Sequence, residues 1–179
     1  MSSKLNVTEI ISGHFATLRL AGGAIAKKDI AVFVVAPVTL SVVFAVCGYD
    51  LNAEIRSLLV NFGAIFTALL LSVLVLVYDQ ERKYEDKKDS DPMSLAKKTL
   101  LHELYYNISF SIVCAISLVI ISLIHALIGG IIIDISLRLV HVSGTVGSFL
   151  ITPLVTFITV TIFLNVIMIV KRMHTLLTT

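Results

Sequence analysis

Charged residues and cysteines are both scarce in this sequence. Asp, Glu, Lys and Arg make up 15% of the 179 residues, whereas soluble domains usually carry about 25%. The two cysteines, Cys47 and Cys114, both lie within apolar stretches, so we expect neither a disulfide scaffold nor a redox-active CxxC site. Together with a hydrophobic content of 57% and a mean hydropathy of +0.98, the shortage of charge excludes an ordinary soluble domain.

Catalytic signatures are missing as well. The sequence contains no HExxH, no GxSxG and no Walker loop, and it has no paired carboxylates in an apolar setting. His102-Glu103 is not followed by the second histidine that a zinc-binding helix needs. We therefore expect no enzyme activity, no metal and no cofactor. The net charge of +2 also gives no excess of basic residues that would favour nucleic acid as a partner.

The sequence does contain four long apolar blocks. Each is close to the roughly 17–25 residues that cross a bilayer, and none holds Asp, Glu, Lys or Arg. The sequence therefore predicts an all-α integral membrane protein with four transmembrane helices arranged as two hairpins. In the first helix, Pro37 should bend the helix or loosen one turn. The blocks are residues 30–48, 57–78, 108–133 and 147–170.

An amphipathic helix is expected at the N-terminus, before the first apolar block. Thr8 is the predicted N-cap and Gly22-Gly23 the predicted end. This helix either lies along the membrane surface or packs as a cap on the end of the helix bundle. No secretory signal is expected in this stretch, because it lacks a compact apolar core and a cleavage site. The apolar face consists of Val7, Ile11, Phe15 and Leu18.

The segment between the second and third blocks is highly charged and should lie in water. Residues 79–88 favour a helix, and Ser90-Asp91-Pro92 interrupts it. A new helix is expected from Pro92 into the third block, with Asp91 as its N-cap. The linker 131–146 alternates apolar and polar residues, which fits either a strand or a surface helix. The predicted regions are thus 1–29, 30–78, 79–107, 108–170 and 171–179.

The basic residues indicate the orientation of the chain. Twelve of the 14 lie before the first block, in the central segment or after the last block, and only Arg56 and Arg138 lie in the two short linkers. Because cytoplasmic loops retain positive charge, both termini and the central segment are expected in the cytoplasm. The location expected for the protein is the inner (plasma) membrane.

Polar residues within the apolar blocks are the candidates for a path or for helix packing. His125 is expected to be a neutral imidazole with one hydrogen-bond partner, the alternative being a titrating switch. Small and hydroxyl side chains fall on one helical face in each of the last two blocks, where they either bring helices together or line a narrow path between assembled subunits. The candidates are Ser122, His125, Thr152, Thr156, Thr159, Asn61 and Asn165, and the face in the third block also holds Ser111, Ala115 and Gly129.

The central segment offers a candidate docking surface. Its second helix carries an apolar stripe that either packs on a neighbouring helix of the chain or binds a cytosolic partner. The residues of the stripe are Met93, Leu100 and Leu104, and the charged residues beside it are Arg82, Lys83, Lys87 and Lys88.

The layout resembles the small four-span membrane proteins of bacterial phage defence, such as the Kiwa membrane subunit. The features that carry the resemblance are the four blocks, the short outer linkers YDLNAEIR and DISLRLVHVSGTV, and the charged hairpin DQERKYEDKKDSDP. The resemblance implies a homo-oligomer in the lipid bilayer that senses membrane disturbance or permeabilises the membrane together with a cytosolic partner. The alternatives are a small housekeeping channel or carrier and a bacteriocin-immunity type of membrane protein.

Overall fold

The structure is a computed structural model that describes four stretches of the chain. These are residues 7–18, 30–85, 92–137 and 140–178, without the side chains of residues 84–85, 92–94, 135–143 and 177. The predicted N-cap Asp91 and the candidate docking residues Lys87 and Lys88 lie outside the described residues, and the side chain of Met93 does so as well.

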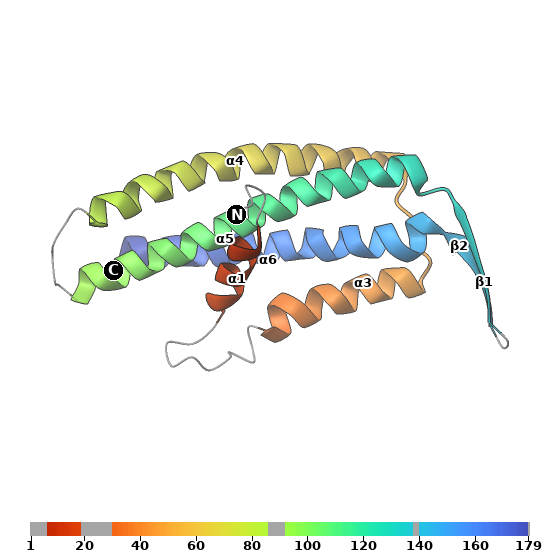
Figure 1. Cartoon of the computed structure of the whole chain (residues 1–179), viewed down its shortest axis with the longest axis horizontal. Helices are drawn as coiled ribbons and strands as arrows, with labels where there is room; N and C mark the ends of the chain where they lie inside the picture. Colours follow the sequence, from red (N-terminus) through yellow and green to blue (C-terminus); the bar gives the residue numbers. More distant parts are fainter. Residues whose placement is uncertain (1–6, 19–29, 86–91, 138–139, 179) are drawn as a thin grey trace, which may run out of the picture.

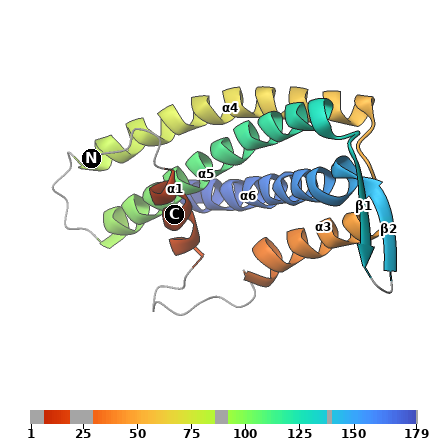
Figure 2. The ribbon, with the colours of Figure 1, turned by 45° about the vertical axis from the view of Figure 1, so that its right-hand side comes forward.

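Four helices lie side by side in the order α4, α5, α6 and α3 (Figures 1 and 2). Their bounds are α3 Ala36–Val46, α4 Ala53–Glu85, α5 Pro92–Ile128 and α6 Thr152–Thr178. The helices α4, α5 and α6 contain segments long and apolar enough to cross a membrane, so the chain is a multi-pass membrane protein. The apolar helix Ala31–Val46, which includes α3, is shorter, and a fourth span is therefore not shown.

Two wide helical turns precede two of the prolines. The π-helical turn η1 (Ala31–Val35) comes just before Pro37, and η2 (Gly147–Ile151) comes just before Pro153. A proline has no N–H to give to the carbonyl four residues earlier, and a widened turn lets carbonyls bond five residues ahead instead. The amide of Ala36 does this to the carbonyl of Ala31. The loosened turn predicted at Pro37 is thus confirmed, and Pro153 has the same effect in the last helix.

The helices α4 and α5 pack along their length and project well beyond a bilayer core. With 33 and 37 residues they are about 50 and 55 Å long, against a hydrocarbon thickness of about 30 Å. The predicted start of a helix at Pro92 that runs into the third block is confirmed.

The end of the molecule where α4 stops and α5 begins is called the charged end below. Its core consists of Leu70, Val77, Leu101, Leu104, Ile108, Ile112 and Ile169.

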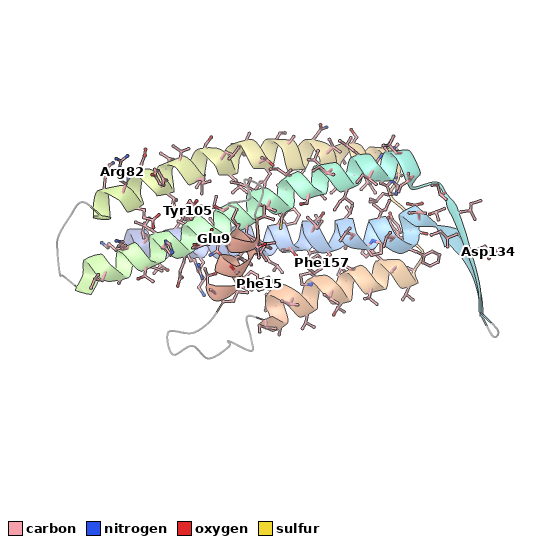
Figure 3. All side chains as sticks on the ribbon, in the orientation of Figure 1. Glu9, Phe15, Arg82, Tyr105, Asp134 and Phe157 are labelled. Carbon is pink, nitrogen blue, oxygen red and sulfur yellow. The ribbon has the colours of Figure 1, made fainter. Side chains whose placement is uncertain are left out.

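A two-stranded antiparallel hairpin joins α5 to η2 at the opposite end, called the hairpin end below. Strands β1 (Ile132–Leu137) and β2 (Val140–Thr145) pair with Ile132 opposite Thr145 and Leu137 opposite Val140. Of the two conformations left open for residues 131–146, the strand is the correct one. The third helix ends at Ile128 and not near residue 133, because its apolar run continues through Gly129-Gly130 into β1. Figure 3 shows Asp134 on this hairpin and Arg82 near the charged end.

The N-terminal helix α1 (Thr8–Ala16) packs across α5 towards the charged end (Figure 1). The prediction that Thr8 is the N-cap was wrong, since Val7 holds that position without a side-chain cap. The predicted end at Gly22-Gly23 was wrong too. The helix stops at Ala16, and the hydroxyl of the next residue, Thr17, lies within bonding distance of the carbonyl of His14 and the side chain of Asn107. Packing on α5 supports the interpretation of this helix as a cap on the bundle.

Candidate functional site

A buried histidine at the hairpin end joins two charged residues from the first linker. The Nε2 atom of His125 lies 2.8 Å from Oδ1 of Asp50, and its Nδ1 atom lies 3.2 Å from a guanidinium nitrogen of Arg56. His125 belongs to α5 and is only 5% exposed, whereas Asp50 precedes α4 and Arg56 lies in its first turn. The three side chains therefore tie the first linker to the end of the third apolar block.

The partners of His125 determine which nitrogen carries the proton. A guanidinium can only donate, so Nδ1 accepts from Arg56 and the proton lies on Nε2, which donates to Asp50. The neutral imidazole expected from the sequence fits this geometry, although it has two partners where one was expected. A cation in the first turn of a helix is disfavoured by the helix dipole. The hydrogen bond to Nδ1 of His125 gives Arg56 a partner at this position.

Asp50 is held in place by two further hydrogen bonds. Its carboxylate also accepts hydrogen bonds from the hydroxyl of Thr145 at 2.8 Å and from the amide of Leu51 at 2.8 Å. Asn52 then caps α4 by accepting from the amide of Ile55. Burial pushes the pKa of Asp50 upward, but the hydrogen bonds from His125, Thr145 and Leu51 outweigh it and hold the pKa below its usual value.

The start of the last apolar block completes this cluster. Thr145 and Ser148 form a reciprocal cap, since the hydroxyl of each accepts from the backbone amide of the other, at 3.1 and 3.2 Å. Between them Gly147 approaches the charged cluster closely. A Cβ at this position would lie 2.6 Å from Oδ1 of Asp50 and 2.7 Å from Nε2 of His125. Only glycine fits there while the two side chains remain bonded.

The stability of the folded state should depend on the ionisation of Asp50. Because its folded-state pKa is below the usual 3.8, the stabilisation is fully present above that value and is lost as the pH falls through the folded-state pKa. We expect Asp50→Asn to lower stability at neutral pH and to flatten the loss of stability in acid. Thermal unfolding in detergent between neutral and acidic pH measures both effects. An acid limb that is the same in Asp50→Asn and in the unchanged chain would contradict this role.

The polar stripe predicted in the third block faces the interior of the protomer. All its members are buried, so the stripe packs inside the protomer. Antiparallel packing on α6 is fixed at one end by the amide of Gly147, which bonds the carbonyl of Gly129, and at the other by the ion pair between Arg172 and Glu103. We call this interface between α5 and α6 the seam. The buried stripe comprises Ser111, Ala115, Leu118, Ser122, His125 and Gly129.

Three buried polar side chains in the seam lack hydrogen bonds. The hydroxyls of Ser122 and Thr152 and both amide atoms of Asn165 have no partner among the described residues. All three side chains are at most 1% exposed. An unsatisfied buried polar group typically costs about 1–3 kcal/mol. These candidates are therefore buried in the protomer, and no hydrogen bond within the described residues satisfies them.

A second polar cluster lies towards the charged end of the seam, beneath α1. The imidazole of His14 donates through Nδ1 to Oδ1 of Asn107 at 2.8 Å, and the ring stacks on Phe110 at 4.0 Å. Arg172 donates to the carbonyl of Thr17 at 3.0 Å. Burial lowers the pKa of His14, the bond to Asn107 opposes this, and the positive charge of Arg172 lowers it further. The helix α1 is thereby fastened to both α5 and α6.

The remaining membrane candidates lie outside the seam. Thr156 and Thr159 line an apolar cavity of about 340 Å³ between α3, the first linker, α4 and α6, and Thr152 of the seam also contributes to its wall. The hydroxyl of Thr159 bonds the carbonyl of Val155 in its own helix. Asn61 is exposed on α4, on a face turned away from α5. The structure thus places Thr156 and Thr159 beside this cavity and Asn61 on the outward face of α4.

The candidate docking stripe is largely covered by the chain itself. Leu104 is 1% exposed in the core of the charged end and cannot meet a partner, and Leu100 is half-buried. The charged residues Arg82 and Lys83 are exposed. What remains available at this end is therefore the charged surface of α4, together with the exposed Leu95 of α5.

Sequence reasoning missed Asp50 and Arg56, the two residues that complete the charged cluster. Both were assigned only to the short linker YDLNAEIR. A usable signal was present, because opposite charges flank the N-cap residue Asn52 and lie at the same end as His125, the single histidine in an apolar block. In comparisons with known proteins, no family model, no curated protein and no solved structure matches this chain.

Proposed function

We propose that this chain is a homo-oligomeric inner-membrane component of a bacterial phage-defence system. In this role it senses membrane disturbance or permeabilises the membrane together with a cytosolic partner. The charged end faces the cytoplasm, following the distribution of basic residues, and η1 with α3 forms a fourth, shorter span. The two short linkers leave little surface for an extracellular ligand.

The observation that carries the proposal is the length of the paired helices α4 and α5. Both run without interruption from the hairpin end to the charged end, and both exceed the bilayer core by about 20 Å or more. Large apolar side chains fill their interface as far as Leu101 and Leu104. A displacement of the spans within the bilayer is therefore carried by a stiff helix pair to a charged cytosolic surface, where a partner can respond to it.

A homo-oligomer is supported by the outward face of α4. This face carries small and polar side chains that are all exposed in the protomer. The amide of Asn61 has no hydrogen-bond partner within the described part of the chain, and an amide can both donate to and accept from its counterpart in a second copy. Small residues along the same face permit close approach of two helices. The face comprises Ser57, Asn61, Ala64, Ala68 and Ser72.

A cytosolic partner is supported by a cavity of about 550 Å³ between α1 and α5. Its lining includes the carboxylate of Glu9, the carboxylate of Glu103, which also pairs with Arg172, and the ring of Tyr106. Carboxylates beside an aromatic ring suit the ammonium or guanidinium of a basic side chain. The partner we expect therefore presents lysine or arginine to this cavity.

Capture from native membranes tests the proposal. Two differently tagged copies of the chain are expressed with their native genomic neighbours, and each tag is used to purify the other copy and any soluble protein. We expect the copies to co-purify together with a soluble partner, and the cells to resist phage in a plating assay. Replacing both Arg82 and Lys83 by alanine should reduce partner capture severalfold, whereas the matched change Lys171→Ala on α6 should not. A monomer that captures nothing and gives no resistance would refute the proposal.

The plating assay, combined with solute-flux and toxin-challenge assays, also separates the alternatives. A housekeeping channel or carrier would alter solute flux without changing phage resistance. A bacteriocin-immunity protein would protect cells only against a pore-forming toxin. Neither result is expected if the chain acts in phage defence.

A further inference from the structure

Two buried hydroxyls of the seam, those of Ser122 and Thr152, are unusual among the hydroxyls of these two helices. Ser111 and Ser117 on α5, and Thr159 and Thr161 on α6, each bond the carbonyl four residues earlier in their own helix. This local bond is the usual way to satisfy a hydroxyl in a membrane helix. The hydroxyls of Ser122 and Thr152 do not make it, and they are unbonded in the part of the chain that the structure describes. They thus remain free to bind another group.

The register of the seam places the unbonded groups at two levels. Counted from the ion pair between Glu103 and Arg172, Ser122 lies nineteen residues along α5 and Thr152 lies twenty along α6. Ser111 lies eight residues along α5 and Asn165 seven along α6, counted in the same way. The hydroxyl level continues to the charged cluster at the hairpin end, and the amide level continues to Asn107 beneath α1.

An apolar layer separates these two polar levels. The two levels are eleven residues apart on α5 and thirteen apart on α6, or about 17–20 Å, and the apolar side chains between them are buried. An apolar constriction of this kind stops conduction by excluding water. The layer comprises Ala115, Leu118, Val155, Ile158 and Ile162.

From this arrangement we propose that the seam is a proton path, closed in this structure by its apolar layer. The proposal deepens the permeabilising function proposed above by naming the species that crosses. When water enters the layer, each hydroxyl accepts a proton on its oxygen and releases its own to the next oxygen, so no net charge stays on the chain. Asn165 holds water by donating and accepting, because an amide does not readily relay protons. The path is expected to carry protons and not hydrated metal ions.

Proton flux into liposomes tests the proposal. The purified full chain is reconstituted with a pH-sensitive dye inside, and a potassium gradient with valinomycin supplies the driving potential. We expect low flux with the unchanged chain and about tenfold more with Leu118→Ser, which admits water to the apolar layer. The matched control is Leu123→Ser, which changes an exposed leucine on the same helix and should leave flux unchanged. If Leu118→Ser does not fold, Leu118→Ala serves in its place.

Two further measurements make the proposal specific. In the Leu118→Ser background, Ser122→Ala and Thr152→Val should each lower proton flux severalfold, because each removes a hydroxyl from the path. Without valinomycin, potassium flux should stay at the level of empty liposomes. Equal proton flux in Leu118→Ser and Leu123→Ser, or potassium flux that rises with proton flux, would overturn the proposal. Phage resistance and partner capture without any proton flux would overturn it while leaving the proposed function in place.

Discussion

Gly147→Ala should lower the free energy of unfolding by about 2 kcal/mol, the typical cost of leaving a buried donor unsatisfied. The added methyl group would lie 2.6 Å from Oδ1 of Asp50 and 2.7 Å from Nε2 of His125, so both side chains must shift. Asp50 is the more exposed of the two and is expected to swing away. The buried N–H of His125 then loses its acceptor. Titration of the protein with SDS in mixed micelles, followed by circular dichroism, measures the change.

Two variants isolate the cause of this loss. Gly130→Ala is the matched control, because a Cβ at Gly130 meets no atom within 4 Å, and we expect a change within about 0.5 kcal/mol. In an Asp50→Ala background, Gly147→Ala should cost much less, since the carboxylate that it displaces is already gone. Equal losses for the two glycines, or full additivity with Asp50→Ala, would show that the charged cluster does not account for the effect.

The apolar helices could be predicted from the sequence because the bilayer makes uniform demands on composition. A segment in hydrocarbon must satisfy its backbone internally and exclude charge, so the helices are visible as uncharged blocks. Pro92 also marked the start of α5 correctly, since proline fits the first turn of a helix. The end of α5 was placed too late because apolar residues continue beyond Gly129-Gly130 into β1. Hydrophobicity alone does not distinguish the last helical turn from a strand that begins beside it.

The candidate site was only partly predictable, because its partners are far apart in sequence. Asp50 and His125 are 75 residues apart, and helical periodicity relates residues only within one helix. The same limit applies to the docking stripe. Periodicity showed that Leu104 faces the same way as its neighbours in the stripe, but not that this face packs in the core of the charged end.

Gly13→Ala should release α1 from the bundle and speed hydrogen exchange of its amides about a hundredfold, equivalent to about 3 kcal/mol. A Cβ at this position would overlap the ring of Tyr106, and its distance to Cγ would be 2.7 Å. Intrinsic helix propensity predicts the opposite sign, because alanine favours a helix by about 1 kcal/mol over glycine. The direction of the change therefore distinguishes packing on α5 from the stability of the isolated helix. Mass-spectrometric exchange of peptides that cover α1 gives the measurement.

Removal of the opposing ring should restore the helix to its place. In a Tyr106→Ala background, Gly13→Ala should no longer speed exchange, whereas Ser12→Ala, at an exposed position of the same helix, should have little effect in either background. Acid should also weaken the docking of α1 on the bundle, as Gly13→Ala does. Because burial lowers the folded-state pKa of His14 below 6.5, the released helix binds the proton more tightly, and docking weakens as the pH falls below that value. Exchange of α1 that is unchanged by Gly13→Ala and by acid would mean that its contacts with Tyr106 and Asn107 do not hold it.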